Sequence, residues 1–202
     1  MEKQDLRVIK TLRQIDAALL DCLRQMPFQK ITIELLCRSA LINRSTFYKY
    51  YVDKYDLLDQ YLERTLSTFR EHVHTDFINA PHSRIQDSSY MLSYQSTLEF
   101  IFSRKEEYQI LWQAEIDRRI FHEMTEILRA SILAALNQTI AADQNKQRYA
   151  DLYAQLFASN MMLLIQWWFQ NPHTVSQEEV EELMSSNMKY GMFKTFKKQM
   201  DQ

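Results

Sequence analysis

The chain has 202 residues, enough for one large domain or two small ones with a sizeable core. It contains one glycine and three prolines, and its hydrophobic residues, 46% of the total, recur in long periodic segments. This composition indicates an all-α fold. The single glycine, Gly191, excludes a phosphate-binding glycine loop or a dinucleotide fold, and no Ser/His/Asp spacing or paired carboxylate cluster indicates an enzyme.

The charge is unevenly distributed along the chain. The net charge is −2, but its distribution differs between the two parts of the chain. Residues 1–54 carry ten Lys/Arg and six Asp/Glu, whereas the remaining residues carry fourteen Lys/Arg and twenty Asp/Glu. A small basic module attached to a larger acidic one suits a protein that contacts phosphate at one end only.

Three further features narrow the class. Cys22 and Cys37 lie on apolar helical faces without a CxxC spacing, so we expect small buried side chains in a reducing compartment. The amino terminus has no apolar core typical of a signal peptide, and the run Met161–Ile165 is far shorter than the ~20 residues of a membrane helix, so we expect a cytoplasmic protein without a membrane partner. The segment His122–Glu126 resembles the start of an HExxH zinc helix but ends in glutamate, so neither a metal nor a cofactor is expected.

Apolar residues at steps of three and four predict a first helix that Pro27 ends. Thr32 is a good N-cap for a second helix that extends to Ala40. The segment Leu41–Asn43 forms a turn, and Asn43 can cap a third helix from Arg44 to about Tyr51. Asp53 can cap a fourth helix that continues to near residue 78 and connects the two parts of the chain.

The clearest break in the sequence is residues 79–83, which include Pro81. Beyond it the pattern predicts helices near 84–103, 105–113, 116–142, 147–170 and 177–198, about nine helices in all. Ser176 and Glu179 have the spacing of a capping box at the start of the last helix. We therefore expect an amino-terminal three-helix helix-turn-helix domain, residues 1–54, followed by a larger helical domain, residues 55–202.

The third predicted helix has two distinct faces. Phe47 and Tyr51 would anchor it in the small core, while its opposite face presents Arg44, Ser45, Tyr48 and Lys49. A guanidinium, hydroxyls and an ammonium are donors suited to guanine edges and phosphates in a DNA groove. Thr32 and Lys54, at the starts of the second and fourth helices, could bind phosphate with the free N–H groups there. For each residue alone, a solvated helix surface or a simple cap is an equally good interpretation.

The segment 31–58, ITIELLCRSALINRSTFYKYYVDKYDLL, resembles the amino-terminal signature of the tetracycline-repressor-like (TetR) family. The residues in register are Thr32, Ala40, Ile42, Thr46, Phe47, Tyr48, Tyr51, Lys54, Leu57 and Leu58. Together, the exposed face and the resemblance predict a DNA-binding set of Thr32, Arg44, Ser45, Thr46, Tyr48, Lys49, Tyr50 and Lys54.

The segment also departs from the signature. Leu41 replaces the turn glycine, Asn43 replaces a serine, and Val52 and Asp53 replace the frequent Pro or Asn. A glycine serves at such a turn for positive φ or close approach, so we expect Leu41 to change the turn slightly.

The carboxy-terminal half has two sets of candidate residues. The helix at 147–170 is apolar on two faces, and the resemblance implies that the last two long helices form a homodimer interface, for which we name Leu156, Leu163, Trp167 and Leu183. A pocket for a small apolar or aromatic effector, as the family often has, would include Tyr94, Phe102, Trp112, Met161 and Trp168. Ordinary core packing is an equally good explanation of these aromatic and methionine side chains.

These observations predict a TetR-type transcriptional regulator, a repressor that binds a palindromic DNA operator as a dimer and is released by a small-molecule effector. The alternative is a helix-turn-helix regulator without such an effector, controlled by a protein partner or acting architecturally. A helical enzyme or adaptor that has lost DNA binding is disfavoured, because the polar positions of the motif are intact.

Overall fold

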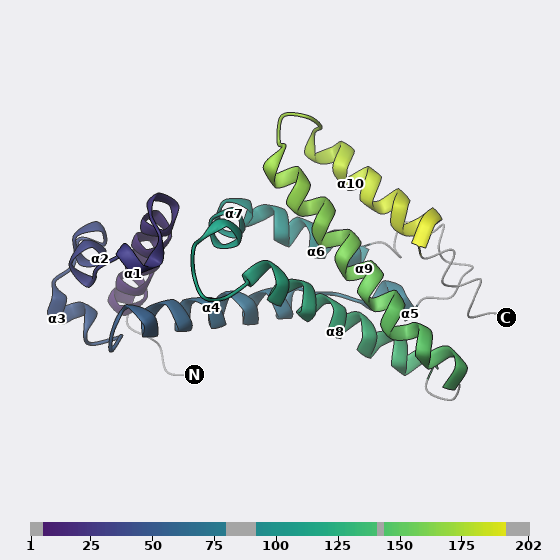
Figure 1. Cartoon of the computed structure of the whole chain (residues 1–202), viewed down its shortest axis with the longest axis horizontal. Helices are drawn as coiled ribbons and strands as arrows, with labels where there is room; N and C mark the ends of the chain where they lie inside the picture. Colours follow the sequence, from purple (N-terminus) through teal and green to yellow (C-terminus); the bar gives the residue numbers. More distant parts are fainter. Residues whose placement is uncertain (1–5, 80–91, 141–143, 193–202) are drawn as a thin grey trace. The chain divides into compact units, whose positions relative to one another are not determined.

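The computed structural model describes residues 6–79, 92–140 and 144–192. These residues form helices joined by short links, and no strand occurs among them (Figure 1). The predicted all-α fold is confirmed. The elements are α1 (Leu6–Gln25), the 3₁₀ turn η1 (Phe28–Lys30), α2 (Ile33–Ser39), α3 (Arg44–Phe47), α4 (Lys54–Glu71), α5 (Asp76–Asn79), α6 (Leu92–Ser103), α7 (Lys105–Gln113), α8 (Ile120–Ile140), α9 (Gln144–Gln170), α10 (Gln177–Ser186) and the π-helical segment η4 (Asn187–Met192). No helix within these ranges has the length and apolarity to span a bilayer.

The chain divides into two compact units. The first contains residues up to Thr68 together with Glu106–Ile120, and the second contains Phe69–Lys105 and the residues from Phe121 onward. The amino-terminal unit is thus larger than the segment 1–54 expected from the sequence. Most of α7 belongs to it because Tyr61 on α4 donates a 2.6 Å hydrogen bond to Glu107, and because the Phe28 N–H donates to the Glu115 carbonyl.

The first three helices form a small core. Ile15 and Leu19 of α1, Leu36 of α2 and Phe47 of α3 are at most 1% exposed. The free thiols of Cys22 and Cys37 are buried here, as predicted. Burial also raises the pKa of both thiols, because it disfavours the thiolate.

Of the three caps predicted in the amino-terminal part of the chain, two are present and one is incomplete. The Thr32 hydroxyl accepts a hydrogen bond from the Leu35 N–H at 3.1 Å, and an Asp53 carboxylate oxygen accepts from the Tyr55 and Asp56 N–H groups at 2.8 and 2.9 Å. Asn43 has the extended backbone of an N-cap, but its side chain makes no capping bond.

The third helix is shorter than predicted. It ends at Phe47 rather than near Tyr51, because the N–H groups of Lys49 and Tyr50 bond three residues back instead of four. The chain still turns in the helical sense there, so residues 48–50 continue along the same surface as a 3₁₀-like turn.

The turn from α2 to α3 is a Schellman motif. The Ile42 N–H donates to the Cys37 carbonyl and the Leu41 N–H to the Arg38 carbonyl. Leu41 has a φ of 55°, the left-handed conformation for which glycine is usual at this position. The replacement of glycine therefore leaves the left-handed backbone in place.

Lys54 connects the start of α4 to the link between α1 and α2. Its ammonium donates to the carbonyl oxygens of Phe28, Gln29 and Ile31 at 3.1, 2.9 and 2.7 Å. The same nitrogen lies 4.9 Å from the ring centroid of Phe28 and 5.3 Å from that of Tyr55. These contacts use all three ammonium hydrogens inside the protein.

In the second unit, α9 has one buried and one exposed apolar face. Residues such as Phe157, Met162 and Ile165 are at most 3% exposed, whereas Leu156 and Leu163 are about half exposed. The capping box at α10 is present as predicted, with Glu179 accepting from the Ser176 N–H and Ser176 accepting from the Glu179 N–H.

Several predicted helix ends differ from the structure. The fourth helix ends at Glu71 rather than near 78, because the Thr97 hydroxyl bonds the His72 carbonyl and the His74 N–H in place of helical partners. Helix α8 starts at Ile120 rather than 116, after a turn closed by the Ile116 N–H and the Ala114 carbonyl, and α9 starts at Gln144 rather than 147. The break at residues 80–83, the start of the helix predicted from 84, residues 141–142 and residues 193–198 lie outside the described residues.

We expect Lys54→Met to lower the free energy of unfolding by about 2–4 kcal/mol, because two half-buried carbonyl groups and one exposed carbonyl group lose a charged donor. Lys49→Met, at an exposed lysine of the same unit, is the matched control and should change it by less than about 0.5 kcal/mol. Chemical denaturation of the three proteins measures both values. Equal stability of the two variants would show that the contacts of Lys54 are energetically unimportant.

Candidate nucleic-acid interface

The α3 surface consists of the outward side chains of α3 and of the turn that follows it. Arg44, Ser45, Tyr48 and Lys49 are exposed, and Thr46 and Tyr50 are half-buried. Phe47 and Tyr51 are 0% and 2% exposed and point into the small core. The division of this segment into a core face and an outer face agrees with the sequence pattern.

Packing and hydrogen bonding hold two of these side chains together. Arg44 hydrogen-bonds Tyr48 one turn further on, and this bond raises the pKa of the guanidinium above its ordinary value, so Arg44 is positively charged at any physiological pH. The Tyr48 ring packs edge-on against the buried ring of Phe47, with centroids 5.7 Å apart. An exposed guanidinium beside a half-exposed phenol can donate to base edges and to phosphate oxygens.

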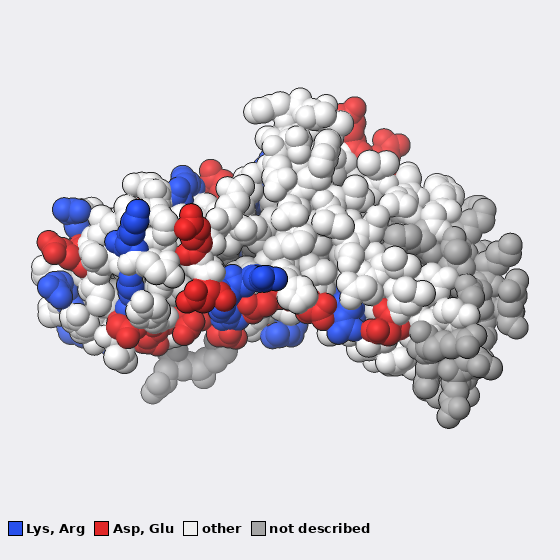
Figure 2. Space-filling model, viewed as in Figure 1, with Lys and Arg blue, Asp and Glu red and all other residues white. Residues whose placement is uncertain are grey.

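The small domain that carries the α3 surface has further basic side chains. Lys30 and Arg38 are exposed there, in addition to Arg44 and Lys49 of the surface itself. On the face shown in Figure 2, lysine and arginine side chains gather over the part of the molecule that holds α2 and α3, with acidic side chains along its lower edge. This part of the surface can attract an anion.

Thr32 and Lys54 lie at helix starts, as predicted, but they are engaged differently. The Thr32 side chain is exposed, and its oxygen serves as the cap of α2 while its hydrogen is available to an acceptor. Lys54 points inward to the three carbonyl groups described above, so in this conformation it has no N–H to offer a phosphate. The sequence places Lys54 at a helix start but gives no signal of this inward direction.

The predicted effector residues do not form one cluster in the structure. Tyr94, Phe102, Met161 and Trp168 are buried in the second unit, where burial raises the pKa of Tyr94. The rings of Phe102 and Trp168 are 5.0 Å apart, and the Lys105 ammonium lies 4.1 Å from the Trp168 ring centroid. Trp112 belongs to the other unit, where it stacks on Tyr108.

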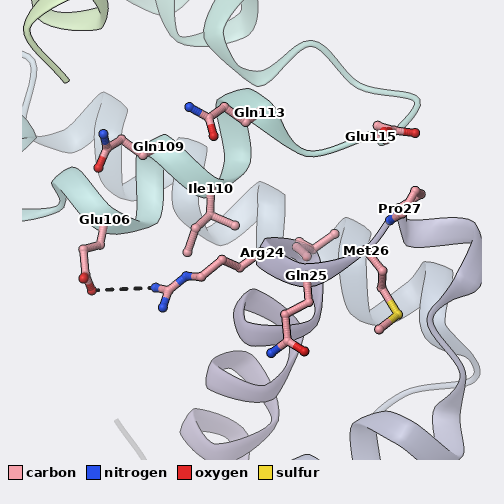
Figure 3. Close-up of a pocket in the computed structure, with 10 residues that line it drawn as sticks. Arg24, Gln25, Met26, Pro27, Glu106, Gln109, Ile110, Gln113 and Glu115 are labelled. Carbon is pink, nitrogen blue, oxygen red and sulfur yellow. Dashed lines mark ion pairs between the residues drawn. The ribbon is translucent and has the colours of Figure 1, made fainter. Parts of the chain in front are cut away.

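Two pockets occur at other places. One of about 460 Å³ lies within the first unit between the end of α1 and α7 (Figure 3). Arg24 crosses toward Glu106, 3.9 Å away, while Gln25 and Gln113 point in different directions, so its polar groups do not converge. The other, of about 140 Å³, is an apolar groove between α9 and α10 lined by Leu164, Trp167, Val175, Glu179, Val180, Leu183 and Met184.

All four predicted dimer residues are exposed. Leu156, Leu163 and Trp167 of α9 and Leu183 of α10 are 46%, 56%, 46% and 57% exposed. Leu152, absent from the predicted set, is 52% exposed and lies one turn before Leu156 on the same face. The sequence does contain a signal for Leu152, because its four-residue spacing from Leu156 places both residues on the same face of a helix.

Part of the chain is similar in sequence to a known protein, and several solved structures resemble the chain as a whole. No family model matches the chain. A 74-residue part, 36% of the chain, is 35% identical to the uncharacterized HTH-type transcriptional regulator YxbF of Bacillus subtilis (strain 168), and the match spans 20% of that relative's length.

Two of the solved structures that resemble the chain align with nearly all of it. A protein from Pseudomonas aeruginosa PAO1 described as a transcriptional regulator aligns over 96% of both chains at 16% identity with a TM-score of 0.55. The dihydroxyacetone kinase operon activator DhaS aligns over 96% of this chain and 97% of its own at 15% identity, with a TM-score of 0.48. The P. aeruginosa protein shares the fold of this chain.

Proposed function

We propose that this protein is a DNA-binding transcriptional regulator of the TetR type that binds a palindromic operator as a homodimer. The observation that carries the proposal is the α3 surface, where Arg44 and Ser45 of α3 and Tyr48 and Lys49 of the following turn are exposed, while Phe47 anchors the other face. The partial similarity to an HTH-type regulator and the fold shared with the P. aeruginosa protein support it. Residues 1–54 would contact DNA, and residues 55–202 would dimerise and bind an effector.

In this proposal the α3 surface enters the major groove. Arg44 donates two parallel hydrogen bonds to a guanine, while Ser45, Thr46, Tyr48 and Tyr50 contact base edges or the sugar-phosphate backbone. Lys49 and Thr32 bind phosphates, and Lys54 acts indirectly by holding the link before α2. A dimer places two such surfaces about 34 Å apart on successive turns of the groove.

The proposal is tested by selecting fragments bound by the full chain from a pool of random duplexes. We expect enrichment of a short palindrome that binds at least a thousandfold more tightly than a scrambled duplex at the same salt concentration. Binding of the scrambled duplex with the same affinity would contradict the proposed function.

Two substitutions separate base reading from phosphate binding. We expect Arg44→Ala to cost about 1–3 kcal/mol of binding free energy and to relax the preference at one base pair of each half-site. Lys49→Ala should weaken binding to all DNA sequences alike, and it should reduce the steepness of log affinity against log salt concentration by about one for each subunit. Titrations of the selected operator and of its single-base variants at several salt concentrations measure both effects. A uniform loss from Arg44→Ala would remove its proposed reading role.

The dimer proposal rests on the exposed apolar face of α9 and α10. Four large side chains, Leu152, Leu156, Leu163 and Trp167, recur on one side of α9 at steps of four, seven and four residues. Leu183 of α10 adjoins them, since it lines the same apolar groove as Trp167. A contiguous apolar stripe on two adjacent helices is typical of an association surface, and a second copy of the same helix pair would complement it.

We therefore expect Leu163→Glu to raise the dimer dissociation constant by about a hundredfold, because two carboxylates would have to be buried against apolar side chains. Leu92→Glu is the control, since Leu92 is 61% exposed on α6 and outside the stripe. Analytical ultracentrifugation of the wild type and both variants gives the result. Unchanged association of Leu163→Glu, or equal weakening by both substitutions, would place the interface elsewhere.

We further propose that the regulator is a repressor released by a small apolar or aromatic effector bound among Tyr94, Phe102, Met161 and Trp168. The support is the burial of these four side chains, the contact between the Phe102 and Trp168 rings, and the cation of Lys105 against Trp168. An effector would act only through its different affinity for two dimer geometries. The alternative is a regulator controlled by a protein partner, which would bind the same operator without release by any small molecule.

A further inference from the structure

Leu41 combines two unfavourable properties. It is the one non-glycine residue with positive φ among the residues that the structure describes, and its side chain is 86% exposed. Val52 and Leu6 are nearly as exposed, but their backbones are not in the left-handed region. A branched side chain at positive φ is strained, and such strain in a folded protein is concentrated at functional positions.

The fold itself does not explain a leucine here. The two hydrogen bonds of the Schellman motif come from the backbone N–H groups of Leu41 and Ile42, so glycine would form them equally well. The exposed side chain contributes little packing within the protein. The leucine thus strains the turn and stabilises nothing visible in the free protein.

The position of Leu41 indicates what it contacts. It is two residues before Asn43, the N-cap of α3, and exposed arginines, Arg38 and Arg44, lie three residues on either side of it. Two guanidinium groups favour an anionic partner, and the α3 surface begins directly beside it. The apolar group that DNA presents in the major groove is the C5-methyl of thymine.

We propose that Leu41 is a specificity-determining residue that packs against a thymine methyl group at the edge of each half-site. The inference rests on the proposed DNA-binding function. It explains the strain, because the leucine side chain gains its apolar contact only in the complex, whereas glycine would relax the turn and lose the contact.

The experiment combines two substitutions with a change in the DNA. In the selected operator each thymine is replaced in turn by deoxyuridine, which lacks only the methyl group. For the wild type, we expect one such replacement in each half-site to weaken binding about tenfold, or about 1.4 kcal/mol. Leu41→Gly should raise the melting temperature, bind the thymine operator about tenfold more weakly than the wild type, and lose nothing further with deoxyuridine.

Leu41→Met keeps a long apolar side chain and is the matched control. It should retain most of the affinity and the preference for thymine over deoxyuridine. The inference is overturned if Leu41→Gly binds the thymine operator as tightly as the wild type does. It is also overturned if Leu41→Gly keeps the wild type's tenfold preference for the thymine operator over the deoxyuridine operator. In either case the wild type would still bind its operator, whereas failure of the proposed function would appear as the absence of specific binding by the wild type.

Discussion

The contact between the Lys54 ammonium and three backbone carbonyl groups determines the geometry of the amino-terminal unit. These carbonyls belong to Phe28, Gln29 and Ile31, the short link from α1 to α2, while Lys54 itself is the first residue of α4. The Phe28 carbonyl also accepts from the Ile31 N–H, so the cation adds a second donor there, and it fixes the link against the start of α4. The rings of Phe28 and Tyr55 pack edge to face around the same nitrogen and limit its access to water. Helices α2 and α3 take their position from this link.

The inward direction of Lys54 changes how the α3 surface could bind DNA. Because Lys54 uses its charge inside the protein, the exposed cations of the α3 surface are Arg44 and Lys49, and Lys30 and Arg38 are exposed on the preceding turn and helix. Few phosphate contacts per subunit mean a modest nonspecific affinity, so specific binding would depend on base contacts and on the doubling of contacts in a dimer. Arg44 is the exposed guanidinium on α3 itself, so it is the side chain best suited to such a base contact.

Sequence periodicity predicted the features that depend on local spacing, and it failed where distant residues decide. The caps at Thr32, Asp53 and Ser176 and the burial of Phe47 and Tyr51 follow from neighbours within four residues. The early end of α4 depends on a hydrogen bond from Thr97, and the place of α7 in the first unit depends on the hydrogen bond between Tyr61 and Glu107. Neither pairing between distant residues can be predicted from the local sequence. The inward direction of Lys54 could not be predicted either, because the local sequence of a lysine at a helix start is the same whether its ammonium faces water or carbonyl groups.

The exposed apolar residues of this chain include a stripe on α9 and the isolated Leu41, and the exposed fraction of the side chains does not distinguish these two cases. On α9 the spacing is informative, because Leu152, Leu156, Leu163 and Trp167 form a stripe that only an extended apolar partner can cover. Leu41 is isolated, and isolated exposed leucines ordinarily need no explanation. Its left-handed backbone sets it apart, since a position that glycine would fill without strain is occupied by a side chain with little to contact in the free protein. Spacing thus supports the proposed partner of α9, and backbone strain supports the proposed contact of Leu41 beside the α3 surface.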